Sequence, residues 1–83
     1  MAVVIGDYRY ELSGDGVSVM AADRTKTSYA DIPETIVYEG VERQVTDMNY
    51  CFWGCTSLTQ VPTIPSSVTN MNYCFWGCTR KLL

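Results

Sequence analysis

The sequence of 83 residues contains no histidine. Acid–base catalysis near neutral pH would therefore depend on carboxylates, and the nine acidic residues show no paired spacing that indicates such a site. No apolar run approaches the roughly 20 residues that a membrane-spanning helix needs. The glycine-rich stretch Ser13-Gly14-Asp15-Gly16 lacks the lysine and the following helix of a phosphate-binding loop. These absences predict a protein that is not an enzyme and has no cofactor, no metal and no membrane span.

Basic residues are also few, six against nine acidic ones, and the net charge is -3. No basic stripe follows the chain, which argues against direct binding of nucleic-acid phosphates. The acidic residues all lie between Asp7 and Asp47, whereas residues 48–79 carry no charge. The acidic half would suit a basic protein partner, with Glu39 and Glu42 as candidate contacts. The alternative is a solvated surface that keeps a small domain in solution.

The length of the chain predicts a single small domain with a thin core. Its first residues, MAVVIGDYRYEL, lack the basic segment and the long apolar segment of a secretion signal. We therefore expect a cytoplasmic location, in a bacterium or a phage-infected host, in preference to the cell surface, unless a signal has been trimmed.

Alternating apolar and polar residues predict two β-hairpins in the first half. Residues 7–12 and 17–21 flank a Ser-Gly-Asp-Gly turn, and residues 36–38 and 41–45 flank a Glu-Gly turn. The polar segment 22–31 between the hairpins is expected to be a loop.

The second half contains a repeat. The string VTDMNYCFWGCT at 45–56 returns as VTNMNYCFWGCT at 68–79, with Asp47 replaced by Asn70 as the one difference. We call these segments the first copy and the second copy. Their offset of 23 residues is typical of solenoid proteins.

The similarity extends upstream of both copies. IPET at 32–35 corresponds to IPSS at 64–67 if residues 36–44 are an insertion. We therefore expect residues 1–44 to form a β-hairpin cap and an elaborated first turn. Residues 45–83 would then form two 23-residue repeats, of which the last is truncated.

Each copy is predicted to combine a short helix with a short strand. In the first copy, Thr46 and Asp47 would cap a helix through Cys51, and Gly54 would end it. The strand would follow in SLTQV, residues 57–61. The second copy has the same pattern.

The stretch from Val45 to Thr79 resembles the bacterial surface-protein type (BspA-like) leucine-rich repeats. Their units run Val-Thr-x-Met-x-Tyr-x-Phe-x-x-Cys-x-x-Leu, followed by Ile-Pro-x-x-Val. The resemblance covers residues 32–79 and implies a right-handed solenoid with short strands that binds proteins or surfaces and has no catalysis in its repeats. The chain departs from this pattern in its few turns and in its end, TRKLL, where Lys81 stands at the position of Leu58.

The expected fold class is therefore mainly β with short helices (α+β). More specifically, we expect a short leucine-rich-repeat-like solenoid of about two turns with an N-terminal β-hairpin cap. Helical spacing would place Met48, Cys51 and Cys55 on its buried face, and the strand would add Leu58 and Val61.

The cysteines form two Cys-x3-Cys pairs, Cys51 with Cys55 and Cys74 with Cys78. This spacing is compatible with a four-thiolate zinc site, although the repeat already accounts for it. Equivalent cysteines on adjacent turns would lie ~5 Å apart, which also allows a disulfide from Cys51 to Cys74 or from Cys55 to Cys78. We expect reduced structural thiols packed in the core, with the disulfide and the zinc site as alternatives.

The remaining aromatic residues point away from the predicted core face. They would form an outward ladder of two tyrosines and two tryptophans, which we call the aromatic ladder: Tyr50, Trp53, Tyr73 and Trp76. Such a surface is typical of a contact site. The alternative is that the hairpins of the first half fold over these rings and make them part of the core.

The predicted function is a non-enzymatic protein–protein interaction module with the aromatic ladder as its partner-binding surface. One alternative is a small acidic phage or mobile-element inhibitor that binds a basic surface of a host or defence enzyme. The other is a self-associating structural element and hence a homo-oligomer, because the terminal turn has no visible cap.

Overall fold

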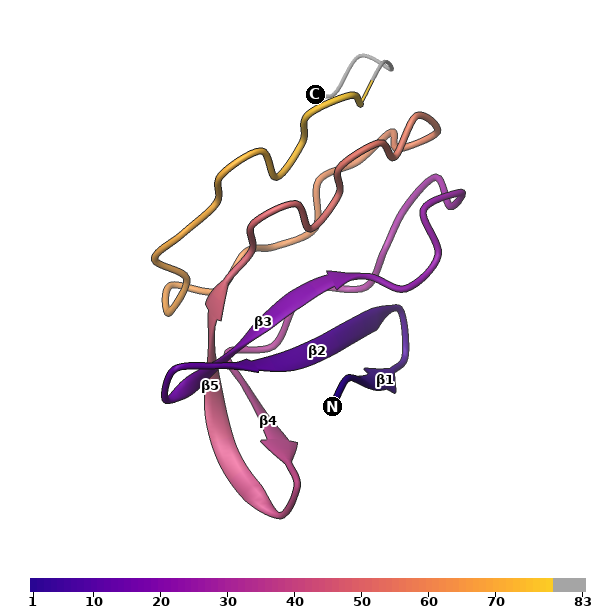
Figure 1. Ribbon diagram of the computed structural model, residues 1–83. Coiled ribbons are helices and arrows are strands. Elements are labelled where there is room, and N and C mark those ends of the chain that lie inside the picture. Colours follow the sequence, from indigo (N-terminus) through magenta and orange to yellow (C-terminus); the bar gives the residue numbers. More distant parts are fainter. Residues whose placement is uncertain (79–83) are drawn as a thin grey trace.

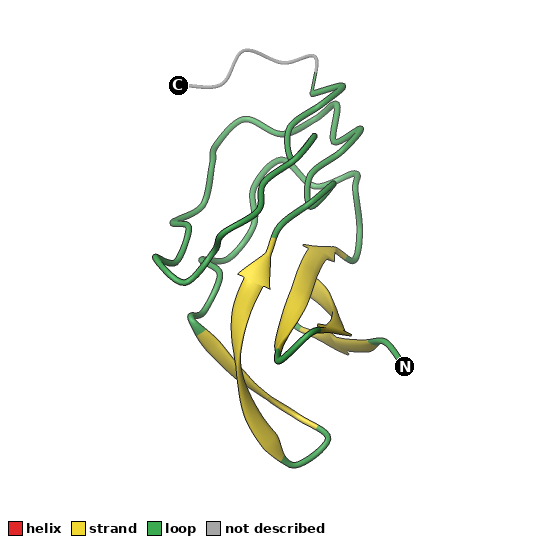
Figure 2. Cartoon of the chain, turned by 60° about the vertical axis from the view of Figure 1, so that its left-hand side comes forward, coloured by secondary structure: helices red, strands yellow, loops and turns green. Residues whose placement is uncertain are grey.

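Five β-strands make up the regular secondary structure of residues 1–78, the part of the chain that the computed structural model describes (Figure 1). The strands are β1 (Val3–Ile5), β2 (Tyr8–Ser13), β3 (Gly16–Ala21), β4 (Thr35–Tyr38) and β5 (Val41–Asp47). They form one curled mixed sheet in the order β1-β2-β3-β5-β4 (Figure 2). The protein is therefore mainly β, as predicted. These residues contain no helix, and so none that could cross a membrane.

Both predicted hairpins are confirmed. β2 and β3 pair antiparallel from Tyr8 opposite Ala21 to Ser13 opposite Gly16. β4 and β5 are joined by Glu39 and Gly40, whose φ angles of 51° and 83° are both positive. This combination is what a two-residue hairpin turn of type I′ requires.

The two hairpins are joined through a parallel contact between β3 and β5, with Val17 opposite Val45. A Cβ atom added to Gly16 would lie 2.7 Å from the carbonyl oxygen of Gln44 and 2.7 Å from the hydroxyl of Thr46. The absence of a side chain at Gly16 is therefore what lets the start of β3 lie against β5. This contact connects the hairpins of the first half to the first copy of the repeat.

The short helices predicted for the two copies are wrong. In the first copy, the N–H of Cys51 donates to the carbonyl of Met48 and that of Trp53 to the carbonyl of Tyr50, each at 3.1 Å. These bonds close four-residue turns, and the N–H groups of Tyr50 and Phe52 bond to the second copy instead of continuing a helix. Tyr50 has a φ of 62°, in the left-handed region that a right-handed helix cannot contain.

The strand predicted for residues 57–61 is also absent, although this segment is held in place. The N–H of Thr59 donates to the carbonyl of Thr27 at 2.8 Å, so the segment 57–61 lies beside the polar loop 22–31. Val61, predicted in the core, is 41% exposed. The departure of TRKLL from the repeat lies outside the described residues.

The two segments that precede the copies, IPET and IPSS, contact each other. The N–H of Ile32 donates to the carbonyl of Thr63 at 3.3 Å, and Ser66 Oγ lies 3.5 Å from Glu34 Oε2. IPET and IPSS therefore lie side by side, and residues 36–44 form most of the β4–β5 hairpin, which extends away from the stacked segments (Figure 1).

The core runs from the first hairpin into the first copy. It joins Tyr8, Tyr10, Val17, Val19, Val45, Met48, Cys51, Phe52, Cys55 and Leu58, which are all 0–2% exposed. The second copy contributes less, because Cys74 is buried but Phe75 and Cys78 are only partly covered. Among residues 1–78, the hydrophobic core is therefore closed over the first copy and thins out at the second.

Candidate functional site: the aromatic ladder

The two copies lie one above the other through a row of backbone hydrogen bonds. Every second N–H of the first copy donates to the second copy: Met48 to Asn70 (2.8 Å), Tyr50 to Asn72 (3.0 Å), Phe52 to Cys74 (2.8 Å) and Gly54 to Trp76 (2.8 Å). The alternate spacing of these bonds brings equivalent residues of the two copies into register, with one β-bridge between Asp47 and Asn70 at its start. Identical side chains therefore stack in columns.

Three such columns are aromatic. The ring centroids of Tyr50 and Tyr73 are 5.5 Å apart with an angle of 15° between the rings, those of Phe52 and Phe75 are 5.5 Å apart at 10°, and those of Trp53 and Trp76 are 5.7 Å apart at 9°. The phenylalanine column enters the core, since Phe52 is fully buried. The tyrosine and tryptophan columns together make the aromatic ladder.

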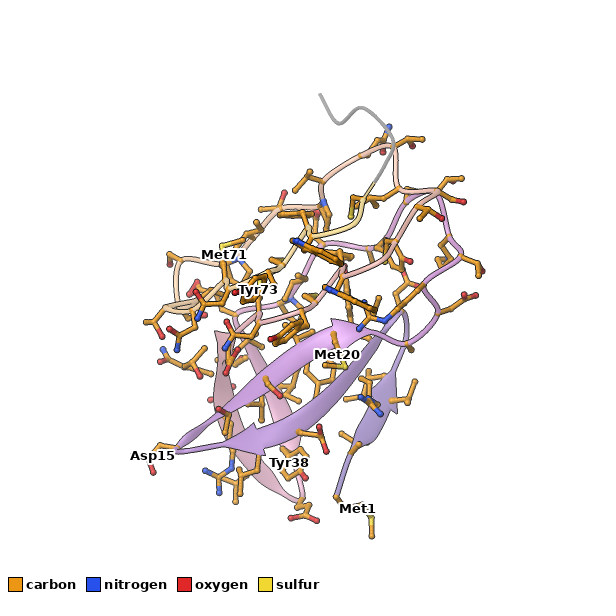
Figure 3. All side chains as sticks on the ribbon, turned by 45° about the horizontal axis from the view of Figure 1, so that its top comes forward. Met1, Asp15, Met20, Tyr38, Met71 and Tyr73 are labelled. Carbon is orange, nitrogen blue, oxygen red and sulfur yellow. The ribbon has the colours of Figure 1, made fainter. Side chains whose placement is uncertain are left out.

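The aromatic ladder is exposed. Tyr50 is 47% exposed, Trp53 42%, and Tyr73 and Trp76 59% each. Figure 3 shows Tyr73 on the stacked turns, away from Tyr38 and the hairpin of β4 and β5. The alternative that the hairpins of the first half cover these rings is therefore wrong, and the predicted outward placement is confirmed.

Stacking covers one face of each ring in these two columns. A ligand therefore cannot insert between the two rings of a column without separating them, whereas Tyr73 and Trp76 remain the more exposed rings of each pair. Within residues 1–78, the hydrogen bonds of Tyr50 and Trp53 use their backbone groups, and the phenol hydroxyl and the indole N–H of these exposed side chains have no partner there. The surface is thus an apolar strip with polar groups along its edge.

Arg24 holds the backbone beneath the ladder, a role that the sequence analysis missed. Its Nη1 donates to the carbonyl of Trp53 at 2.5 Å, and its Nη2 donates to the carbonyl of Tyr50 at 3.1 Å. The N–H of Ala21 donates to the carbonyl of Cys51 at 2.9 Å. Arg24 and Ala21 therefore close the edge of the first copy that faces away from the second. A single arginine in a polar loop carries no sequence signal for this role.

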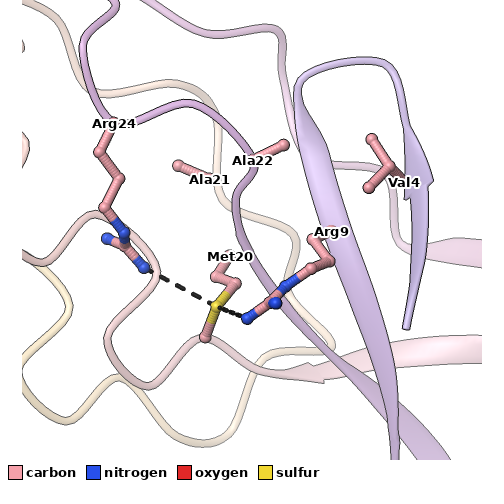
Figure 4. A pocket seen from close by; sticks show the side chains of 6 residues that line it. All are labelled: Val4, Arg9, Met20, Ala21, Ala22 and Arg24. Atoms are coloured by element: carbon pink, nitrogen blue, oxygen red, sulfur yellow. Dashed lines mark hydrogen bonds between the residues drawn. The ribbon is translucent and has the colours of Figure 1, made fainter. Parts of the chain in front are cut away.

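The other side of Arg24 borders a shallow pocket of about 280 Å³ lined by Val4, Arg9, Met20, Ala21, Ala22 and Arg24 (Figure 4). Met20 Sδ lies 2.8 Å from the guanidinium of Arg9 and 3.7 Å from that of Arg24. Arg9 is exposed, whereas Arg24 is partly buried by its contacts with the first copy. The pocket thus places the two guanidinium groups on either side of one sulfur atom.

All four cysteines are free thiols, and three of them are buried. The contact with the Cys51 thiol lowers the pKa of Cys74, whereas that same contact and then burial raise the pKa of Cys51. Cys78 Sγ donates to the carbonyl of Phe52 at 3.1 Å, and Cys55 Sγ lies 3.6 Å from the Tyr29 hydroxyl. The equivalent thiols of Cys51 and Cys74 are thus in contact, as the stacked side chains of the two copies are. In the described part of the chain, no three potential ligands gather at a point that suits a metal.

The acidic candidates, Glu39 and Glu42, lie on the β4–β5 hairpin, at the end of the molecule away from the stacked copies (Figures 1 and 2). Both are exposed, and Glu42 Oε2 lies 3.4 Å from the hydroxyl of Thr35. The structure therefore does not combine them with the aromatic ladder into one surface.

Comparisons with protein-family models, with curated proteins and with solved structures gave no match. The function is therefore argued from the geometry of this chain, and the resemblance to leucine-rich repeats stays a prediction.

Proposed function

We propose that this chain is a non-enzymatic protein-interaction module built on leucine-rich-repeat-like turns, with the aromatic ladder as its contact surface. The observation that carries the proposal is the exposure of four large rings, 42–59% each, in a segment without charge. Burial of such rings in a complex would remove much apolar area from water without separating ion pairs.

The stacking of the rings favours binding for an entropic reason. Each ring is already stacked on its equivalent, so binding of a partner would cost little additional side-chain entropy. Tryptophan and tyrosine are the side chains that most often dominate binding energy at protein interfaces. The hydroxyl and N–H groups at the rim favour a partner with hydrogen-bond acceptors around an apolar centre, which describes a protein surface.

The repeat-like part of the proposal is supported by the register of the two copies. The rings that stack are those 23 residues apart in the sequence, which is the period of the repeat. The contacts between IPET and IPSS bring the segments before the two copies together as well. The BspA-like resemblance implies such stacking, and it also implies binding as the use of the fold.

A second candidate function is favoured by the β4–β5 hairpin. Glu39 and Glu42 are exposed there, and the one salt bridge among residues 1–78 lies elsewhere, between Lys26 and Asp7 at 3.6 Å. The acidic tip would suit a basic groove on a host or defence enzyme, as an inhibitor of that enzyme.

Site-specific photo-crosslinking in cells that naturally make the protein tests the proposal. We expect benzoylphenylalanine in place of Trp76 to give a discrete adduct with a partner protein. The matched control is the same substitution at Leu12, which is apolar and 51% exposed on β2 but lies outside the ladder. No adduct from position 76, or the same adducts from positions 12 and 76, would contradict the proposal.

A third crosslinker position separates the alternatives. Val37 is 64% exposed on β4, next to the acidic tip. An adduct from position 37 that is lost at high salt would favour the acidic inhibitor, because exposed charges are screened beyond about 10 Å at 0.1 M salt. An adduct between two copies of the 9.3 kDa chain would instead favour the self-associating element.

A further inference from the structure

The second copy ends in a backbone edge whose N–H groups have no acceptor among residues 1–78. In the first copy, the N–H groups of Met48, Tyr50, Phe52 and Gly54 all donate to the second copy. The equivalent N–H groups belong to Met71, Tyr73, Phe75 and Gly77, and no described residue accepts a hydrogen bond from them. We call these four groups the donor edge. Rows of unpaired backbone groups are sites at which other chains add a strand.

The apolar side chains next to the donor edge are more exposed than their equivalents in the first copy. Met48 is fully buried but its equivalent Met71 is 39% exposed. Phe52 is fully buried, whereas Phe75 is only partly covered. Among the described residues, Met71 and Phe75 thus lack the cover that the second copy gives to Met48 and Phe52, whereas Cys74 is buried like Cys51.

The hydrogen bonds between the copies have a direction, and this direction restricts the partner. The carbonyl edge of the first copy is occupied by the N–H of Ala21 and the guanidinium of Arg24. The carbonyl edge of the second copy is occupied by the first copy. A dimer formed symmetrically through this end would set one donor edge against another, and N–H groups do not accept hydrogen bonds. This argues against a symmetric dimer through the end of the stack.

Within this molecule, the second copy itself is the segment that binds the corresponding N–H groups of the first copy. The eight residues MNYCFWGC are identical in the two copies, so the donor edge has the same side chains and the same spacing as the edge that the second copy occupies. What fits the first copy should fit the second. The requirements are backbone carbonyls at every second residue, and flat side chains that continue the columns.

We propose that the donor edge binds a polypeptide segment of another protein that has the sequence pattern of these copies. The segment presents its carbonyls to the N–H groups of Met71, Tyr73, Phe75 and Gly77, and it adds one ring to the tyrosine column and one to the tryptophan column. The inference goes beyond the proposed function, because main-chain hydrogen bonds at the end of the stack carry the binding and the rims of the aromatic ladder do not.

Amide hydrogen exchange measured by NMR on the full chain tests this inference with matched pairs of groups. In the chain alone we expect slow exchange at Tyr50 and Phe52 and fast exchange at Tyr73 and Phe75, because only the first pair is hydrogen-bonded between the copies. Slow exchange at both pairs in a monomeric sample would show that the chain covers its own edge, and would overturn the inference. Protection at Tyr73 and Phe75 that grows with protein concentration would show self-association and would overturn it as well.

The probe for the second step is a synthetic peptide of residues 68–78, VTNMNYCFWGC, added under reducing conditions. We expect it to slow exchange at the donor edge by about tenfold or more, while a peptide of the same composition in scrambled order has no such effect. Absence of protection at the highest soluble peptide concentration overturns the inference. Peptide binding that quenches tryptophan emission without protecting the donor edge also overturns it, and would leave the proposed role of the aromatic ladder standing.

Discussion

Truncation of Phe52 and of Phe75 to alanine should destabilise the protein by very different amounts, although the two residues are equivalent in the repeat. Phe52 is 0% exposed and its ring lies 5.1 Å from that of Tyr29, 6.2 Å from that of Tyr8 and 5.5 Å from that of Phe75. Phe75 is partly exposed, and Phe52 is its one aromatic neighbour among residues 1–78. The pair thus compares one side chain in two states of burial.

The expected magnitudes follow from this difference in burial. Loss of a fully buried phenylalanine ring costs about 3 to 5 kcal/mol, because apolar contacts are lost and a cavity is left. Phe75 is covered mainly on one face, so we expect roughly half of that cost, about 2 kcal/mol. A domain of this size has a total stability on the order of 4 to 12 kcal/mol. Phe52→Ala would therefore remove a large share of it, whereas Phe75→Ala should stay folded.

Urea unfolding followed by circular dichroism measures both values. If Phe52→Ala does not fold, Phe52→Leu and Phe75→Leu provide a milder pair in which the same order is expected. For Phe75→Ala, a loss of 2 kcal/mol corresponds to a fall in Tm of roughly 8 to 16 °C. Equal losses at the two positions would refute the reasoning, because they would show that the outer face of the second copy is as well covered as that of the first.

Two further predictions concern the first half of the chain. Arg24→Ala should lower the free energy of unfolding by about 1 to 3 kcal/mol, because it leaves backbone carbonyls of the first copy without their charged donor. Arg9→Ala, in the same pocket, should change the free energy of unfolding by less than about 0.5 kcal/mol. Equal effects of the two substitutions in urea unfolding would contradict the role of Arg24 in binding these carbonyls. Alkaline pH should also destabilise the protein, because burial raises the pKa of Tyr8 and of Tyr29. The unfolded chain ionises its tyrosines near a pKa of about 10 while the folded chain keeps these two neutral, so this contribution to stability is complete below about pH 10 and is lost above it. A urea midpoint that is unchanged or higher at about pH 11 than at about pH 8 would count against it.

The sequence by itself determined the features that depend on local pattern or on identity between segments. Alternation and turn residues located both hairpins, and positive φ at Glu39 and Gly40 explains why Glu-Gly was a sufficient signal. The repeat determined the register of the two copies, because identical segments that stack in register bring identical residues together. The outward position of the aromatic ladder was predicted from helical spacing, and the four rings are exposed although residues 45–78 contain no helix. β1 was missed, since three apolar residues paired at the sheet edge, with Val3 opposite Tyr10, give no alternating pattern.

Only the tertiary structure decided how the repeated segment folds. A single copy offers a helix cap at Thr46 and Asp47 and a helix end at Gly54, and these local signals predict a short helix. In the folded chain, every second N–H of the first copy finds a carbonyl of the second copy, and these bonds replace those that a helix would have made internally. The role of Arg24 arises in the same way, because its guanidinium reaches the carbonyls of Tyr50 and Trp53 only in the folded arrangement of the turns. Hydrogen bonds between segments far apart in the chain are invisible to local spacing, and here they determine both the backbone of the site and the direction in which its edge can bind.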